Sequence, residues 1–153
     1  METIFEKQNQ RWAEIQNRVG DYCDELDDLS NMCADLEEAR QALDRVDWSR
    51  VSSEKHDEVL LEMKEHVDYV ADQIKEMEAQ FHLLCDFMEE ALFSFILSSK
   101  QANQYDNEEC QRVMREELNE YKSFVLTIQE RFGFERTDEQ KAKRTKRLKE
   151  VTS

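Results

Sequence analysis

The segment that decides the fold is residues 60–97, LLEMKEHVDYVADQIKEMEAQFHLLCDFMEEALFSFIL. Apolar residues recur in it every seven positions, in two interleaved rows. The first row is Leu60, Val67, Ile74, Phe81, Met88 and Phe95, and the second is Met63, Val70, Met77, Leu84 and Ala91. A strip of large apolar side chains is unfavourable in water, so a helix with this pattern buries the strip against other helices. The sequence therefore predicts a long helix that works by packing against helices.

A second long helix is expected before it. Two heptad rows run from residue 5 to residue 43, namely Phe5, Trp12, Val19, Leu26, Cys33 and Arg40, and Gln8, Ile15, Tyr22, Leu29, Leu36 and Leu43. The segment DWSRVSS, residues 47–53, interrupts them and offers serines as helix caps. We expect helices over about 2–46 and 54–102. Because the connection is short, they should form an antiparallel coiled-coil hairpin in which residue i faces roughly residue 100 − i.

A third, shorter helix is predicted over residues 107–132. Asp106 and Glu109 resemble a capping box at its start, and Gly133 followed by Phe134 matches a left-handed C-cap at its end. Thr137 and Gln140 are spaced to cap a fourth, short helix, but residues 141–149 contain six basic residues and almost no apolar face. We therefore expect an all-α fold. Its domain, residues 1–135, is an elongated three-helix bundle, and residues 136–153 form a basic tail that is a short or frayed helix.

The composition favours this architecture and restricts the partners. The chain has no proline and two glycines, and its 37% of charged residues leave enough apolar material for narrow cores only. The net charge is −15, with 33 acidic and 14 basic residues in 1–135 against 3 and 7 in 136–153. An acidic body repels nucleic acid and anionic lipid. The expected partners are other helical or coiled-coil proteins or a second copy of the chain. The basic tail alone could serve as a nuclear-import signal, contact nucleic acid or bind an acidic partner.

The cysteines and the apolar runs bear on the compartment. Cys23, Cys33, Cys85 and Cys110 are widely spaced and form no CxxC pair, which indicates a reducing compartment. The longest apolar run, residues 91–97, is far below the roughly 18 residues of a membrane span, and no secretory leader is evident at the start. We expect a cytoplasmic or nuclear protein with no membrane insertion.

No constellation for catalysis or for a cofactor is apparent. His56, His66 and His82 are not preceded by a glutamate three residues earlier, as a di-metal helical bundle requires, and two isolated glycines cannot build a phosphate loop. His82 and Cys85 are one helical turn apart but have no evident orienting group or oxyanion donor. We therefore expect no enzyme activity, no cofactor, no metal and no small-molecule substrate.

The segment 81–97 carries apolar residues beyond its heptad rows. These extra residues point in nearly every direction around the helix and are the candidate partner-binding residues: Leu83, Phe87, Leu92, Phe93, Ile96 and Leu97. A helix that is apolar all round is buried all round. Either the third helix folds back and closes this segment within the chain, or part of it stays open and receives a partner helix or a second copy.

Two polar residues occupy heptad positions of the first helix, Gln8 and Arg40. A buried polar group in a coiled coil can set register or partner choice at a cost in stability, so both are candidate register-setting residues. The alternative is that both residues lie at frayed, solvent-exposed ends of the heptad rows.

Three functions fit the pattern. The first is a non-catalytic scaffold or adaptor subunit that assembles into a multi-subunit complex through coiled-coil packing. The second is a self-contained bundle that homo-oligomerises or binds peptide helices. Trp12 resembles the tryptophan that spectrin-type repeats carry in their first helix, although helices of such unequal length depart from that pattern. The third and narrower one is a kinetochore or spindle subunit, because residues 121–134 are similar to the end of such stalks, or a vesicle-tethering subunit with similar rods.

Overall fold

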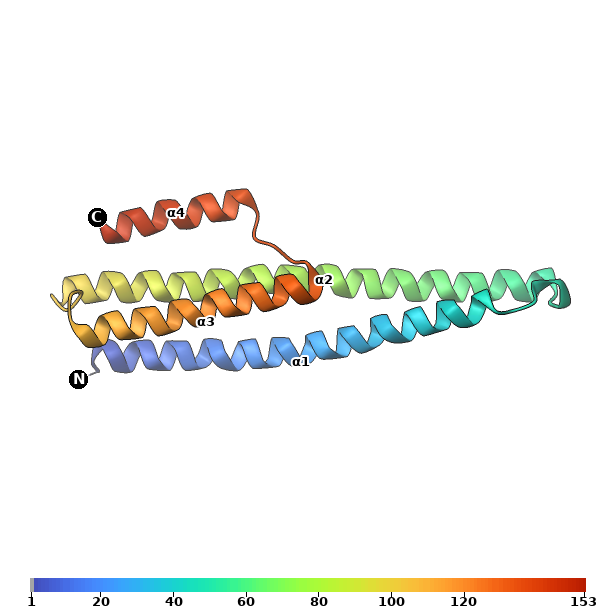
Figure 1. The fold of residues 1–153 in the computed structure, drawn as a ribbon, viewed down its shortest axis with the longest axis horizontal. Coiled ribbons are helices and arrows are strands. Elements are labelled where there is room, and N and C mark those ends of the chain that lie inside the picture. The colour runs from blue at the N-terminus through green and yellow to red at the C-terminus, as the bar shows by residue number, and fades with distance from the viewer. Residues whose placement is uncertain (1) are drawn as a thin grey trace. The chain divides into compact units, whose positions relative to one another are not determined.

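The regular structure of the described residues is helical. The computed structural model describes residues 2–153, and no strand occurs among them, which confirms the all-α prediction. The elements are α1 (Ile4–Asp44), the 3₁₀ turn η1 (Trp48–Arg50), α2 (Ser53–Gln101), α3 (Glu108–Phe132) and α4 (Asp138–Thr152), as Figure 1 shows. The three long helices begin and end within about two residues of the predicted positions.

Side-chain caps set the first residues of α1 and α2. The Thr3 hydroxyl accepts the Glu6 backbone N–H at 3.1 Å, and the Glu6 carboxylate accepts the Thr3 N–H at 3.4 Å, so α1 begins at Ile4. The Ser52 hydroxyl accepts the Lys55 N–H at 3.2 Å and starts α2 one residue before the predicted position. Each cap satisfies a backbone donor that has no partner within the helix.

The caps of α3 and α4 follow the predicted chemistry with one correction. α3 is capped by Asn107, whose side chain accepts the Glu109 N–H at 2.8 Å, and not by Asp106, because asparagine at the adjacent position is an equally good cap. Gly133 has φ of 74° and donates its N–H to the Gln129 carbonyl at 2.8 Å, as predicted for the C-cap. The capping box of Thr137 and Gln140 is formed as well.

The chain divides into two compact units. The four-helix unit holds the residues up to Val19 together with Gln80–Ser153, and the hairpin unit holds Gly20–Ala79. Residues 136–153 thus group with the four-helix unit, whereas the sequence suggested a tail separate from a domain over 1–135. The reason is that α4 packs on its neighbours: Val151 is only 3% exposed, and Arg136 just before the helix is 6% exposed.

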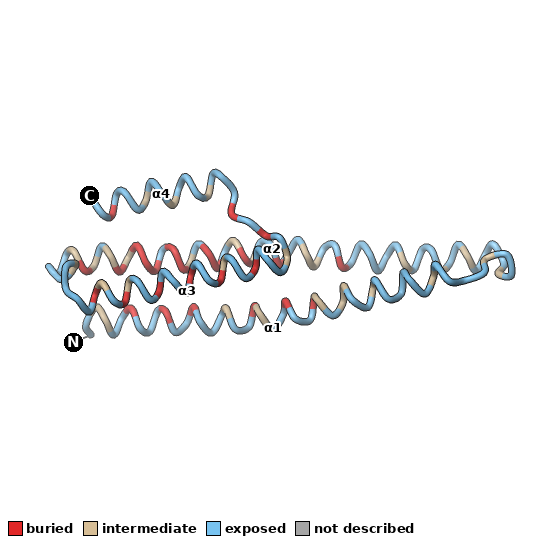
Figure 2. Tube along the Cα trace, viewed as in Figure 1, coloured by how far each residue is buried: buried red, intermediate tan, exposed pale blue. Residues whose placement is uncertain are grey.

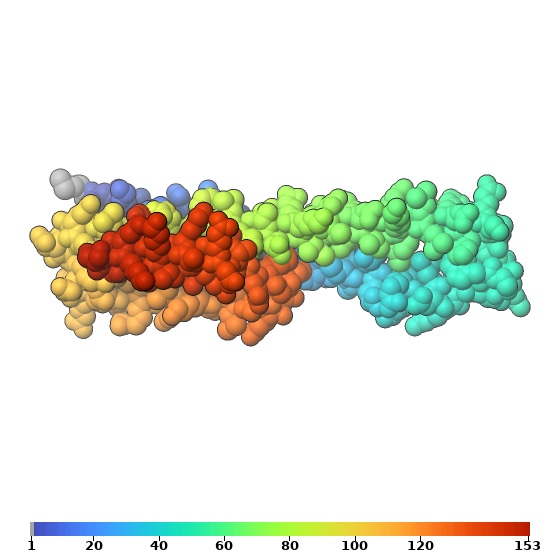
Figure 3. All heavy atoms as spheres, turned by 90° about the horizontal axis from the view of Figure 1, so that it is seen from above, coloured from blue at the N-terminus to red at the C-terminus, as the bar shows by residue number. Residues whose placement is uncertain are grey.

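The four-helix unit contains the larger core. It consists of the first part of α1, the last part of α2, α3 and α4, and the buried residues concentrate on α2 after residue 80 (Figure 2). Phe95, Cys110 and Val113 form one buried cluster, with Phe5 packed against it. The rings of Phe5 and Phe95 meet edge to face with centroids 6.1 Å apart. α4, red in Figure 3, lies over α2 and α3.

The hairpin unit has only α1 and α2, joined through η1. Leu26, Leu29 and Val70 are buried in it, and the Tyr22 hydroxyl donates to the Met77 carbonyl at 2.8 Å. The two residue numbers of this pair add up to about 100, as do those of Phe5 and Phe95 in the other unit. Both contacts therefore agree with the predicted antiparallel register.

No membrane-spanning element is present in the described range. Among residues 2–153, none of the helices combines the length and the apolar character needed to cross a lipid bilayer.

Candidate functional site

The six predicted partner-binding residues lie on α2 in the four-helix unit, but they differ in exposure. Leu92 and Phe93 are buried at 7% each, Phe87 and Ile96 are half-buried, and Leu83 at 52% and Leu97 at 39% are exposed. The segment 81–97 is thus closed in large part by helices of the same chain. It is not a single open patch.

Three of the six residues meet in one apolar groove between α2, α3 and α4. The groove has a volume of about 430 Å³, and its apolar lining is Leu92, Phe93, Ile96, Met114, Leu118 and Leu148. Leu118 and Leu148 form its rim and are 40% and 44% exposed. Positions 92, 93 and 96 come together because they lie within about one helical turn on one side of α2.

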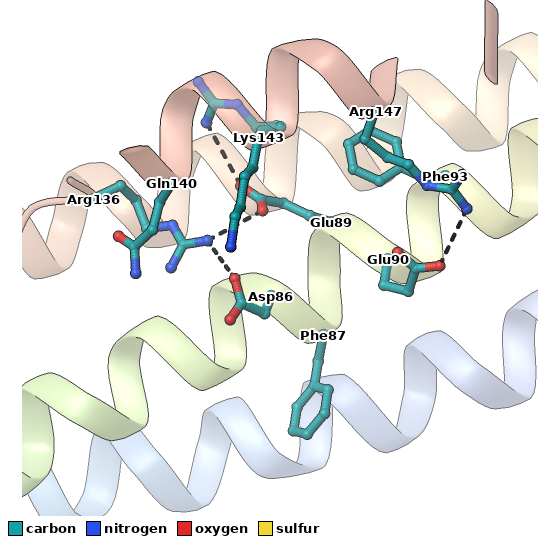
Figure 4. A pocket seen from close by; sticks show the side chains of 10 residues that line it. Asp86, Phe87, Glu89, Glu90, Phe93, Arg136, Gln140, Lys143 and Arg147 are labelled. Atoms are coloured by element: carbon teal, nitrogen blue, oxygen red, sulfur yellow. Dashed lines mark hydrogen bonds and ion pairs between the residues drawn. The ribbon is translucent and has the colours of Figure 1, made fainter. Parts of the chain in front are cut away.

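The other three residues point elsewhere. The ring of Phe87 turns toward α1 (Figure 4). The Arg18 guanidinium of α1 lies 4.9 Å from the ring centroid. Leu97 lines a separate cavity of about 280 Å³ shared with Ile4 and Gln8 of α1. Leu83 is exposed and does not line the apolar groove. The sequence grouped them with Leu92 because all six are apolar residues outside the heptad rows, and that pattern does not say where the neighbouring helices lie.

A charged pocket lies between α2 and α4. Its volume is about 530 Å³, and its lining includes the acidic Asp86, Glu89 and Glu90 of α2 and four basic residues from Arg136 and α4, namely Arg136, Lys143, Arg144 and Arg147 (Figure 4). Opposite charges thus face each other across it. The pocket shows where the positive charge of the predicted basic tail is directed: at acidic residues of the same chain.

Arg136 is the most buried charged group of this pocket. Its guanidinium donates to the Asp86 carboxylate, to Glu89 Oε2 at 3.2 Å and to the His82 carbonyl at 3.2 Å, while its side chain is only 3% exposed. Burial lowers the pKa of Arg136, but the hydrogen bond to Asp86 and the charge of Glu89 outweigh it and raise the pKa overall. The guanidinium therefore stays charged and holds the start of α4 against α2.

Glu89 receives three partners from three different segments. Besides Arg136, it accepts the Tyr121 hydroxyl of α3 at 2.5 Å and lies 3.7 Å from Arg144 of α4. Burial and the bond to Glu89 raise the pKa of Tyr121, so its hydroxyl keeps the proton that it donates. Glu89 is 10% exposed, and a carboxylate this buried requires such partners.

Gln8 is buried, as its predicted role requires, and it contacts α3. Its side-chain amide donates to Glu117 Oε2 at 2.7 Å, and both residues are almost fully buried. Burial raises the pKa of Glu117 to about 7, although the hydrogen bond from Gln8 opposes the shift. Beside this pair, the Trp12 indole N–H donates to Glu120 at 2.6 Å. The sequence did not single out Glu117 because it is one of 36 acidic residues.

Arg40 does not occupy a buried position in the hairpin unit. Its side chain is 57% exposed and pairs with Glu37 at 2.6 Å and Asp44 at 3.2 Å, both on α1 itself. The burial on which a register-setting role depends is therefore missing, because the guanidinium finds its acidic partners one turn away on its own helix.

Cys85 and His82, the cysteine–histidine pair one turn apart, lie beside packed and charged side chains of the four-helix unit. Cys85 is fully buried, and burial raises the pKa of its thiol to about 12, so the reactive thiolate does not form at neutral pH. The nearby His82 ring lies 3.3 Å from the Arg136 guanidinium. No group of three potential metal ligands occurs among residues 2–153.

The groove also includes residues that sequence reasoning did not assign to a site. Met114 and Leu118 lie on α3, and Leu148 is a lone leucine in the basic tail. The only available signal was that Met114 and Leu118 are apolar residues four positions apart, which places them on one side of the helix. Comparison of the chain with protein families, curated proteins and solved structures found no match. The geometry of the site therefore carries the functional conclusion.

Proposed function

We propose that the protein is a non-catalytic scaffold or adaptor subunit that assembles with other proteins by packing against their helices. The observation that carries this proposal is the apolar groove of the four-helix unit, with its rim at Leu118 and Leu148 open to solvent. The antiparallel pairing of α1 and α2 in a coiled-coil arrangement belongs to the same proposal, since it presents long helical surfaces to partners.

The shape and chemistry of the groove suit an apolar anchor of a partner helix. Its volume of about 430 Å³ falls in the range of binding pockets, and six of its lining residues are apolar. Polar groups at the rim, Lys122 and Arg144, can bond to polar groups that flank the anchor. Grooves of this kind hold amphipathic helices through one or a few large apolar side chains.

The test is a rim variant compared with a matched control. The double substitution Leu118→Gln and Leu148→Gln removes the apolar rim, whereas Leu126→Gln changes a leucine of α3 that is 55% exposed and outside the groove. Each tagged protein is used for quantitative affinity purification from native extract. We expect specific partners to fall about tenfold with the rim variant and to remain with the control, which corresponds to about 1.4 kcal/mol. Equal recovery of every partner with both variants would count against the proposal.

A second function is favoured by the closure of segment 81–97 within the chain. Leu92 and Phe93 are 7% exposed under α3 and α4, as in a self-contained, spectrin-like bundle that oligomerises with itself or binds peptide helices. Light scattering after size-exclusion chromatography distinguishes the two functions. A concentration-dependent dimer that the rim variant abolishes supports self-association, and a monomer at all concentrations supports the adaptor.

The compartment is part of the same proposal. Cys85 and Cys110 are buried free thiols, which is typical of proteins in the reducing cytoplasm or nucleus. Kinetochore, spindle and vesicle-tethering complexes use helical subunits of this general type. Identification of the proteins recovered in the purification above decides among them.

A further inference from the structure

The hairpin unit exposes apolar side chains on one face of α2. Leu60 is 49% exposed and Val67 is 43% exposed, and the two lie seven residues apart, so they project from the same side of the helix. Met63 and Ile74 lie beside them and are half-buried. We call Leu60, Met63, Val67 and Ile74 the hairpin face.

The composition of the unit explains why this face is exposed. Within the hairpin unit α2 has one helical neighbour, α1, which buries Val70 and Met77. A single neighbour covers only part of a wide apolar stripe. Figure 2 shows this difference along α2: the stretch before residue 80 is mostly blue and tan, and the stretch after it is largely red. The hairpin face therefore has room for one more helix.

The negative charge of the protein is concentrated in the same unit. Residues 20–79 contain 19 acidic and 6 basic side chains, a net charge of −13, out of −15 for the whole chain. The four-helix unit is left with −2 because the basic residues of α4 belong to it. Arg144 and Arg147 of α4, and Arg136 just before it, are paired there with acidic residues of α2.

We propose that the hairpin face binds a basic amphipathic helix of another protein. Its apolar side would cover Leu60 and Val67, and its lysines and arginines would lie among the acidic side chains of the unit. A second copy of the chain fits poorly, because it would bring a second hairpin of charge −13 against the first. This surface is separate from the apolar groove, so it extends the proposed function to a protein that contacts two partners.

The negative charge of the hairpin unit determines how binding of a basic helix should depend on salt. Attraction between a −13 unit and a basic helix speeds association and weakens as salt screens the charges. The apolar contact supplies the dependence on Leu60 and Val67, which nonspecific attraction to an acidic protein would lack.

The test uses two designed helical peptides that share one leucine stripe. Outside the leucine stripe, the charged residues of one peptide are all lysine and those of the other are all glutamate. Binding of each peptide to the full chain is measured by fluorescence anisotropy. The double variant Leu60→Gln and Val67→Gln is compared with Leu61→Gln and Tyr69→Gln. Leu61 and Tyr69 are exposed at 57% and 55% on the same helix but lie off the hairpin face. Circular dichroism verifies that both variants keep the helical content of the parent.

We expect one lysine peptide to bind per chain at least about tenfold more tightly than the glutamate peptide. The face variant should weaken it about tenfold, and the control variant should leave it within about twofold. Equal weakening by both variants would mean attraction by charge alone and would overturn the proposal. Equal binding of the two peptides, or a chain dimer that the face variant dissociates, would overturn it too. The variant of the groove rim is not used in this experiment. A negative result for the hairpin face therefore leaves the proposed function of the groove untouched, and the reverse also holds.

Discussion

Glu117 is an acidic side chain held inside the four-helix unit with a single neutral partner, the amide of Gln8. An ionised carboxylate in such surroundings loses hydration that one neutral hydrogen bond does not replace. Its neighbours Glu120 and Glu116 raise the pKa further, to about 7 in total. Near neutral pH the residue therefore exchanges a proton while remaining part of the contact between α1 and α3.

This proton makes stability depend on pH. The folded pKa of about 7 exceeds the ordinary value of 4.5, so between these values the folded protein holds a proton that the unfolded chain has lost. The stabilising contribution of protonated Glu117 is complete below pH 4.5 and is lost as the pH rises through 7. Glutamine keeps the hydrogen bond to Gln8 and never ionises.

We therefore predict that Glu117→Gln raises the free energy of unfolding at about pH 8 by on the order of 1 kcal/mol. The gain should shrink toward pH 5, where the wild-type carboxyl is already protonated in the folded state. Urea denaturation of the parent and the variant at a series of pH values measures the gain in unfolding free energy and its decrease toward low pH. As a control, Glu116→Gln alters an exposed neighbour and should show a smaller change. A gain that grows toward low pH would contradict the assigned protonation.

At the scale of elements, α4 is attached mainly by charge. Its buried apolar contribution is essentially Val151, and Leu148 stays 44% exposed. The attachment comes from Arg136 on Asp86 and Glu89, from Arg144 on Glu89, and from Arg147 on Glu90 at 3.6 Å. These pairs differ in burial, and buried pairs lose much more than exposed ones when one partner is removed.

We predict that Arg136→Ala lowers stability by about 2 kcal/mol, because Glu89 keeps only Tyr121 and Arg144 as partners. Hydrogen exchange should quicken first at the Val151 amide, while Ile128 in α3 stays protected. The matched control is Arg147→Ala, whose side chain is 39% exposed and whose loss should cost less than about 1 kcal/mol. Equal losses from the two substitutions would show that burial of Arg136 does not determine the attachment of α4.

The elements differ in how far periodicity could predict them. α1 and α2 were predictable because their heptad rows contain five or six positions each, and the Thr137–Gln140 capping box marked the start of α4. The docking of α4 was not predictable, since its few apolar residues give no face. Its attachment depends on which of many acids Arg136 reaches in space. In the same way, Leu92, Phe93 and Ile96 could be recognised as candidates, but Met114 and Leu148 opposite them could not.

At the scale of the whole molecule, charge is divided very unequally between the two units. The hairpin unit holds a net charge of −13 on 60 residues, and the four-helix unit holds −2 on the remainder. Repulsion among like charges opposes folding of the first and hardly affects the second. Screening by salt therefore acts selectively.

We predict that raising NaCl from about 20 mM to about 500 mM slows hydrogen exchange in the hairpin unit more than in the four-helix unit. The amides of Leu26 and Val70 report the first, and those of Phe81 and Ile128 report the second. Each unit serves as the control for the other in one sample. The same increase in protection at all four amides would indicate that self-repulsion does not limit the hairpin.

Each unit contains cysteines whose reaction rate can report how often that unit opens. Cys33 lies half-buried in the hairpin unit, while Cys85 and Cys110 are fully buried in the four-helix unit. A maleimide or other alkylating reagent attacks only an accessible thiolate, and Cys85 offers neither access nor charge while its helices stay packed. The order in which peptide mapping finds adducts at Cys33, Cys85 and Cys110 would thus record which part of the native chain opens first, without any engineered label.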